Sequence, residues 1–140
     1  MAEYRVILVE KDNLMLERLS RVIHNTKGFD LAARYTAAQD ALGQAGPFKP
    51  NLILLDTDDS ENITFIPLLH QQFPQTFILC CGMRWHAQAA NQMLQSGAAG
   101  YLVKPFTSDE LIAAAEAFNT GSIGKNVSEV SAFFSPKGKS

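Results

Sequence analysis

The chain lacks most of the features that would assign it a specialised environment. Of its 140 residues only Cys80 and Cys81 are cysteines, and because they are adjacent they cannot link distant segments. No apolar run approaches the roughly 20 residues of a membrane span. The acidic N-terminus, MAEYRVILVE, does not resemble a signal peptide. The net charge of −2 provides no basic surface for nucleic acid or anionic lipid. We therefore expect a cytoplasmic protein with reduced thiols, without nucleic-acid binding or direct membrane insertion.

The composition supports one ordinary folded domain, because 46% of the residues are hydrophobic and 19% are charged. Short apolar runs, typical of buried strands, occur at 5–9, 31–35, 51–55, 77–81 and 100–103. Between and after them, patterns typical of helices occur at 13–25, 36–45, 63–73, 87–96 and 107–119. The last helix begins with a capping box formed by Thr107 and Glu110.

Alternation of apolar strands with helices predicts an α/β fold in which helices cover both faces of a parallel sheet. Because crossover connections are right-handed, few arrangements of five strands remain. We predict a doubly wound, flavodoxin-like sheet with strand order 2-1-3-4-5.

Two charged residues follow buried strands of this predicted sheet. Asp56 ends the run NLILLD, and Lys104 follows the run GYLV and precedes Pro105. In an open parallel sheet, ligands bind beyond the carboxyl ends of the strands. An aspartate and a lysine brought to that edge suggest a site that accepts a phosphoryl group.

These segments resemble the receiver domain of two-component response regulators over residues 4–120. The resemblance rests on VILVEKDN, NLILLD and GAAGYLVKPF, and it implies a CheY-like fold. It makes Asp56 the phosphoacceptor position, Glu10 and Lys11 the acidic-pair positions that hold Mg²⁺, and Lys104 the lysine that binds phosphoryl oxygens.

The resemblance further implies that Tyr101 is the aromatic switch position. A hydroxyl residue should follow the fourth strand, and its position falls at Gly82 or at Cys81. Neither residue carries a hydroxyl group. At the acidic pair, moreover, Lys11 introduces a cation where a carboxylate would help hold the metal.

Two interpretations of the site follow. Asp56 is either a working phosphoacceptor that uses Mg²⁺, or a residue held without metal in an ion pair with Lys11 or Lys104. We predict the second, so that the domain has no catalytic residue, metal or cofactor. The loop TDDSEN would then be a solvated acidic loop, since Glu61 and Pro67 exclude a calcium-binding loop.

The chain changes character after residue 120. We expect residues 1–120 to form the receiver-like domain, 121–128 a linker, and 129–140 the start of a second domain. The segment AFFSPKGKS resembles the beginning of the deviant Walker A loop of MinD/ParA-type ATPases, with Lys137 as the signature lysine. Lys139 departs from that motif because a second glycine is usual there. A basic tail without this role is the alternative.

A degenerate receiver followed by such an ATPase resembles the CpaE/TadZ proteins of Flp/Tad pilus assembly. That resemblance implies a non-enzymatic interaction and localisation domain, with association to a cell pole or membrane through partners. We predict a homodimer through 87–96, 100–103 and 108–119, which are rich in alanine. A signal receiver phosphorylated on Asp56 is the alternative. A flavodoxin-like enzyme is disfavoured, because VEKDN lacks the glycines of a phosphate loop.

Overall fold

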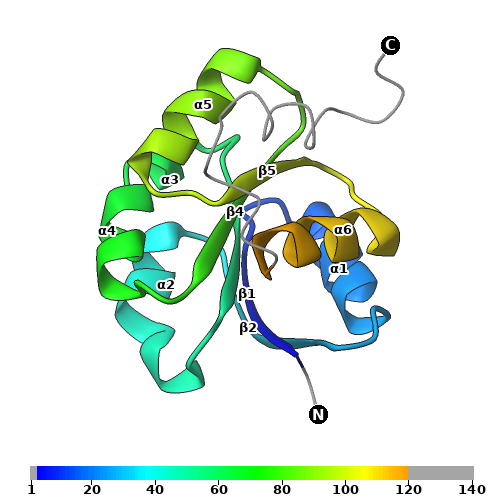
Figure 1. Ribbon diagram of the computed structural model, residues 1–140. Coiled ribbons are helices and arrows are strands. Elements are labelled where there is room, and N and C mark those ends of the chain that lie inside the picture. The colour runs from blue at the N-terminus through cyan, green and yellow to red at the C-terminus, as the bar shows by residue number, and fades with distance from the viewer. Residues whose placement is uncertain (1–2, 120–140) are drawn as a thin grey trace.

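The computed structural model describes residues 3–119 and shows a single five-stranded parallel sheet between two layers of helices (Figure 1). Its strand order is β2-β1-β3-β4-β5, as predicted. The strands are β1 (Tyr4–Val9), β2 (Phe29–Tyr35), β3 (Leu52–Asp56), β4 (Phe77–Gly82) and β5 (Gly100–Val103). The predicted linker, the predicted second domain and Lys137 lie outside the described residues.

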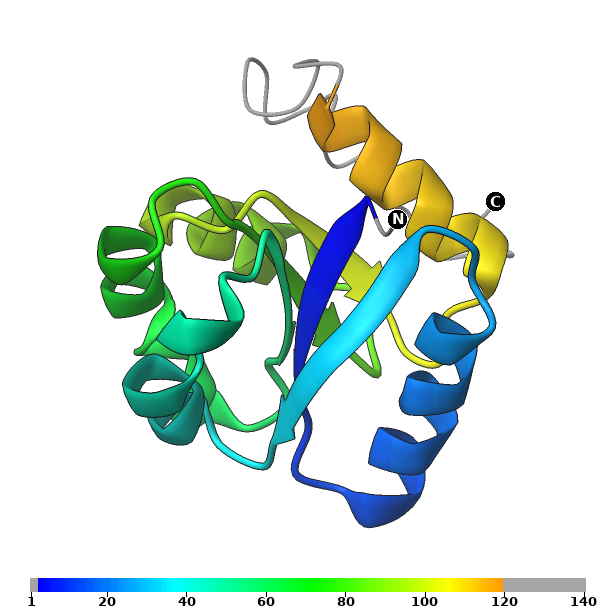
Figure 2. The ribbon, with the colours of Figure 1, turned by 90° about the horizontal axis from the view of Figure 1, so that it is seen from below.

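The helices cover both faces of this sheet (Figure 2). On one face lie α1 (Asn13–His24) and α6 (Ser108–Asn119). On the other face lie α2 (Ala38–Gln44), α3 (Ser60–Ile63), α4 (Ile66–Gln72) and α5 (Ala87–Ser96). A short 3₁₀ helix, η1 (Gly46–Phe48), follows α2.

Alternating side chains of the central strands pack into two separate hydrophobic clusters. In β1, Val6 and Leu8 face the cluster under α1 and α6, whereas Ile7 and Val9 face the cluster under α2, α4 and α5. All of β3 is buried. Helices on both faces explain why these strands appear in the sequence as continuous apolar runs. Packing on both sides also fixes the carboxyl ends of β1 and β3 next to each other.

One predicted helix is wrong in outline. The expected helix at 63–73 is instead two helices, α3 and α4, separated at Thr64 and Phe65. The first begins inside the predicted acidic loop because the Asp59 side chain accepts a hydrogen bond from the Glu61 amide and caps it. Pro67 lies in the first turn of α4, where its missing N–H costs nothing.

Other local predictions are confirmed. The Thr107 hydroxyl accepts from the Glu110 amide at 3.1 Å, and the Glu110 carboxylate accepts from the Thr107 amide at 2.9 Å, which completes the capping box. Gly97 ends α5 with φ of 126°, a backbone conformation that residues with a side chain rarely adopt.

Within residues 3–119 no helix has the length and apolar character to span a bilayer.

Candidate functional site

Three strands deliver charged side chains to one buried point at the carboxyl edge of the sheet. Glu10 follows β1, Asp56 is the last residue of β3, and Lys104 follows β5. Their relative exposures are 2%, 3% and 4%. Charges this deeply buried are tolerated only when they are paired and hydrogen-bonded. The sequence prediction that Asp56 and Lys104 share this edge is therefore confirmed, and Glu10 joins them.

Lys104 is the centre of the charge cluster. Its ammonium nitrogen Nζ lies 2.8 Å from Glu10 Oε1, 2.9 Å from Asp56 Oδ1 and 3.1 Å from Asp58 Oδ2. The contacts with Glu10 and Asp56 are hydrogen bonds, which use two of the three N–H donors of the ammonium group, and the contact with Asp58 is an ion pair. The lysine thus binds the acidic site internally, without any added ion.

Of the two lysines considered as partners for Asp56, the structure selects Lys104. The Lys11 side chain is exposed, and within the described chain no ion pair joins it to Glu10 or Asp56. Next to it, the Asp12 amide donates to Glu10 Oε2, and the Asp12 carboxylate caps α1 by accepting from the Met15 amide. Of the two ion pairs predicted as alternatives for Asp56, the described residues therefore show the one with Lys104.

Asp58 belongs to the site, although the sequence predicted only a solvated acidic loop for the segment TDDSEN that contains it. Besides its ion pair with Lys104, its carboxylate accepts from the Met83 amide at 3.1 and 3.2 Å, at the beginning of the β4–α5 loop. Its own amide donates to Asp56 Oδ1 at 2.9 Å. Asp58 therefore ties the loop after β3 to the loop after β4. The signal in the sequence that could have assigned Asp58 to the site was its position two residues after Asp56.

The structure resolves which residue occupies the hydroxyl position. Cys81 is buried in the cluster under α1 and α6, whereas a side chain at Gly82 would meet Asp58 Oδ1 at 3.3 Å and the Tyr101 hydroxyl still more closely. Gly82 therefore faces the site, and Cys81 does not. The space that a serine or threonine side chain would fill at this position is taken by Tyr101.

Tyr101 is fixed in this inward position. It is buried, its hydroxyl donates to the Arg84 carbonyl at 2.7 Å, and its ring meets Trp85 edge-on with centroids 5.6 Å apart. Burial is the largest factor that raises the pKa of Tyr101, to about 12. The absence of a side chain at Gly82 is what allows this arrangement.

Burial and pairing act in opposition on the charged groups. Burial raises the pKa of Glu10 and outweighs the opposing hydrogen bond from Lys104. For Lys104, burial lowers the pKa, but the bonds to Glu10 and Asp56 reverse this and leave it above its usual value. The lysine is thus held in its charged form. Burial likewise raises the thiol pKa of Cys80 and Cys81, which keeps both thiols protonated and unreactive.

The residues present do not fit a magnesium ion. The acidic pair supplies one carboxylate, Glu10, and Glu10 Oε1 and Asp56 Oδ1 both bind the same ammonium group. Magnesium requires oxygen ligands around a position free of other cations. Within residues 3–119, no group of three or more His, Cys, Asp and Glu side chains is arranged to hold a metal.

An open cleft of about 780 Å³ lies over this cluster. Its rim carries two exposed apolar side chains, Leu14 from α1 and Met83 from the β4–α5 loop. Neither residue was predicted from the sequence to belong to the site. The fold and the cleft at the carboxyl ends of β1, β3 and β5 define a receiver-type domain.

The chain belongs to the family described as "Response regulator receiver domain", whose sequence pattern matches residues 6–116. The prediction of that family and of a CheY-like fold is confirmed.

Curated relatives carry the names of regulatory proteins. A probable C4-dicarboxylate response regulator DctR from Halalkalibacterium halodurans is 27% identical over 112 residues, covering 79% of this chain and 49% of its own length. A positive alginate biosynthesis regulatory protein from Pseudomonas aeruginosa is 30% identical over 111 residues, covering 76% and 43%. The chain therefore spans about half the length of the curated relatives it matches.

Solved structures show the same fold. A two-component response regulator of the LuxR family from Aurantimonas sp. has a TM-score of 0.78 and 22% identity, with 94% of this chain and 96% of that chain covered. The isolated REC domain of RcsB from Salmonella enterica, solved with phosphomimetic BeF₃⁻, has a TM-score of 0.73 and 16% identity, with 91% and 98% covered. These comparisons give the CpaE/TadZ resemblance no support.

Proposed function

We propose that this receiver domain is a protein-interaction module whose conformation does not depend on phosphorylation of Asp56. The observation that supports it is the position of the Lys104 ammonium, within 3.1 Å of Glu10, Asp56 and Asp58. Phosphoryl transfer relies on positioned groups that neutralise the charge spreading over the phosphoryl oxygens. Here the lysine already serves three carboxylates.

Two substitutions remove the other groups that the family resemblance assigns to this chemistry. Lys11 replaces the second acidic residue, and Gly82 supplies no hydroxyl to a phosphoryl oxygen. Asp58 and Asp59 line the cleft and add negative charge beside Asp56. An incoming phosphoryl group would meet repulsion without a metal to offset it.

The test is incubation of the protein with acetyl phosphate and Mg²⁺, followed by intact-mass measurement. We expect no mass increase from a phosphoryl group. The matched variant is Lys11→Asp, which restores the acidic pair at an exposed position and should fold normally. Phosphorylation of the natural protein, lost in Asp56→Asn, would contradict the proposal.

The second candidate is a signal receiver phosphorylated on Asp56. It is favoured by the retention of Asp56, Lys104 and Tyr101, and by relatives that are named as response or transcriptional regulators. In that case Mg²⁺ would be required, and the experiment above would give a labelled Asp56. The comparisons favour this candidate, whereas the altered site residues favour the first.

The place of the domain in a larger protein remains a proposal from sequence alone. The CpaE/TadZ resemblance depends on residues 129–140, which lie outside the described residues. Reading the coding sequence beyond Ser140 tests it: a continuation into Gly-Lys-Thr and a helix would support an ATPase. A DNA-binding domain there would place the chain with the transcriptional regulators.

Homodimerisation through α5, β5 and α6 also stays a proposal. Its support from the alanine content of these elements is weakened by where the alanines lie. Of the seven alanines in 87–96, 100–103 and 108–119, Ala87 and Ala113 are exposed and Ala89 is half-buried. The others lie in the core: Ala90, Ala114, Ala115 and Ala117. Light scattering at high protein concentration tests the dimer, which a purely monomeric result would exclude.

A further inference from the structure

The Asp58 carboxylate is bound by donors from two other parts of the fold. Its Oδ2 atom lies 3.1 Å from the ammonium nitrogen of Lys104, the residue that follows β5. Its two oxygens accept from the amide of Met83, the residue that follows β4, at 3.1 and 3.2 Å. Asp58 itself lies just after β3. One side chain therefore joins the segments that follow three neighbouring strands.

These two donors form a binding site for a carboxylate. A charged ammonium group beside a backbone N–H binds anionic oxygens, and hydrogen bonds to charged groups are about twice as strong as neutral ones. The site is confined on one side, because a Cβ at Gly82 would lie 3.3 Å from Asp58 Oδ1. The Asp58 side chain is 44% exposed, so the site opens to the cleft.

The remaining charged residues of the cleft do not hold Asp58 in place. Most of them are acidic and repel its carboxylate. These acidic residues are Glu10, Asp12, Asp56 and Asp59. Lys11 also lines the cleft, but within residues 3–119 no ion pair joins it to Asp58. The attraction that holds the Asp58 carboxylate therefore comes from Lys104 and from the Met83 amide.

The contact with Met83 bears on the whole start of the β4–α5 loop. Arg84 comes next, and its carbonyl accepts from the Tyr101 hydroxyl at 2.7 Å. Trp85 follows, and its ring meets the Tyr101 ring edge-on with centroids 5.6 Å apart. The segment 83–85 is thus held at two points, by Asp58 at its first residue and by Tyr101 at the next two.

We propose that Lys104 and the Met83 amide form a carboxylate-binding site whose ligand is Asp58, and that occupation of this site fixes the β4–α5 loop with Tyr101 inward. The proposal rests on the proposed function, because it names the contact that keeps one conformation without a phosphoryl group. When the Asp58 carboxylate is removed, the same donors should accept a small free carboxylate such as formate.

Amide hydrogen exchange in Asp58→Ala, followed by NMR, tests the site itself. This variant should fold, because the side chain that it removes is 44% exposed. We expect the Met83 amide to exchange about tenfold faster than in the natural protein, because it loses a hydrogen bond to a charged group. Sodium formate at up to about 0.3 M should slow it again, since a free carboxylate must replace a tethered one of at least millimolar effective concentration. Sodium chloride at the same ionic strength should not.

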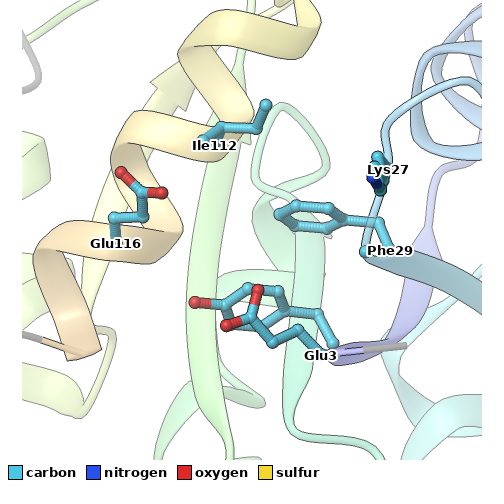
Figure 3. A pocket seen from close by; sticks show the side chains of 7 residues that line it. Glu3, Lys27, Phe29, Ile112 and Glu116 are labelled. Carbon is cyan, nitrogen blue, oxygen red and sulfur yellow. The ribbon is translucent and has the colours of Figure 1, made fainter. Parts of the chain in front are cut away.

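Two control variants remove one negative charge elsewhere. Asp59→Asn removes it from the same cleft and keeps an oxygen that can cap α3 at the Glu61 amide. Glu116→Gln removes it from α6, where Figure 3 shows Glu116 beside a second hollow at the start of β1 and β2. Both variants should leave the exchange rate of Met83 within about twofold of its natural value.

A third control separates the two lysines of the cleft. Lys11→Met, added to Asp58→Ala, should leave the response of the Met83 amide to formate unchanged. Loss of the response would overturn the proposal, because it would assign the bound carboxylate to Lys11 instead of Lys104.

The single tryptophan reports whether the site fixes the loop. Trp85 is half-buried in the natural protein. In Asp58→Ala we expect its emission to shift to longer wavelength and its quenching by acrylamide to increase, and formate should reverse both changes. Unchanged Trp85 emission and quenching in Asp58→Ala would overturn the claim that occupation of the site fixes the loop.

The exchange measurement has two outcomes that overturn the proposal. One is an unchanged Met83 rate in Asp58→Ala, and the other is a faster rate that formate does not slow. Both are distinct from failure of the proposed function, which the mass measurement tests on the natural protein. Phosphorylation of Asp56 there would contradict the proposed function even if Met83 responds to formate as expected.

Discussion

Replacing Lys104 by methionine should destabilise this protein more than any other single change at the site. Methionine keeps most of the length of the side chain but removes the charge. The Lys104, Glu10 and Asp56 side chains are 3%, 3% and 4% exposed, so water cannot replace the lost partner. Removing one partner of a buried ion pair typically costs about 3–5 kcal/mol, because the remaining charge stays buried.

The magnitude rests on two of the three ion pairs. Asp58 is 44% exposed, and a pair with such a group contributes about 1 kcal/mol or less. Glu10 and Asp56 carry the main cost. We therefore expect the free energy of unfolding of Lys104→Met, measured by urea titration at pH 7, to fall by about 3–5 kcal/mol.

The matched control is Lys11→Met, which removes a charge from the exposed lysine next to Glu10. It should change the free energy of unfolding by about 0.5 kcal/mol or less. The triple variant Glu10→Gln, Asp56→Asn, Lys104→Met should recover much of the stability that Lys104→Met loses, since no buried charge remains. A loss below about 1 kcal/mol for Lys104→Met would refute the reasoning.

Three further predictions concern Gly82, Glu10 and Asp12. Gly82→Ala should lower the free energy of unfolding by about 1–3 kcal/mol in thermal unfolding, because the new Cβ meets the Tyr101 hydroxyl. Adding Tyr101→Phe to the same chain should recover part of the lost stability. An equal loss with and without that hydroxyl would contradict the prediction. Because the pKa of Glu10 is raised in the folded state, the folded protein keeps the Glu10 proton at pH values where the unfolded chain has lost it. The free energy of unfolding, measured by urea titration, should therefore fall as the pH rises from about 4.5 through that raised pKa. Glu10→Gln should flatten this slope, and an unchanged slope would assign it to another group. Asp12→Ala should cost about 1 kcal/mol in urea unfolding by removing the cap on the Met15 amide, whereas a neutral result would show that water caps α1 equally well.

The sequence was most informative where apolar spacing and end signals agree. The bounds of α5 and β5 are as predicted, because a helical apolar face ends at Gly97 and a short apolar strand ends before Lys104. The break between α3 and α4 was missed because Thr64 and Phe65 carry no turn signal, and because the cap that starts α3 depends on how Asp59 folds back.

The site was predictable in its location but not in its contacts. Strand ends place Glu10, Asp56 and Lys104 at one edge, and this follows from topology alone. Which lysine turns inward depends on the start of α1, where the Asp12 cap leaves Lys11 exposed. The inward position of Tyr101 depends on the space above Gly82, which no spacing rule encodes.

The buried alanines of α6 illustrate the same limit for surfaces. Periodicity shows that a helix has a small-residue face, but not whether that face meets the sheet or a partner. In this chain, Ala114 and Ala115 pack under the helix against the sheet. An exposed interface must therefore be argued from other residues.

The central claim is that Lys104, rather than a divalent cation, neutralises Glu10 and Asp56. Titration of the protein with Mg²⁺, followed by backbone NMR of residues 10–12 and 56–58, tests it directly. The account predicts no saturable shift in the natural protein. A saturable shift at Glu10 and Asp56 that disappears in Asp56→Asn would contradict it.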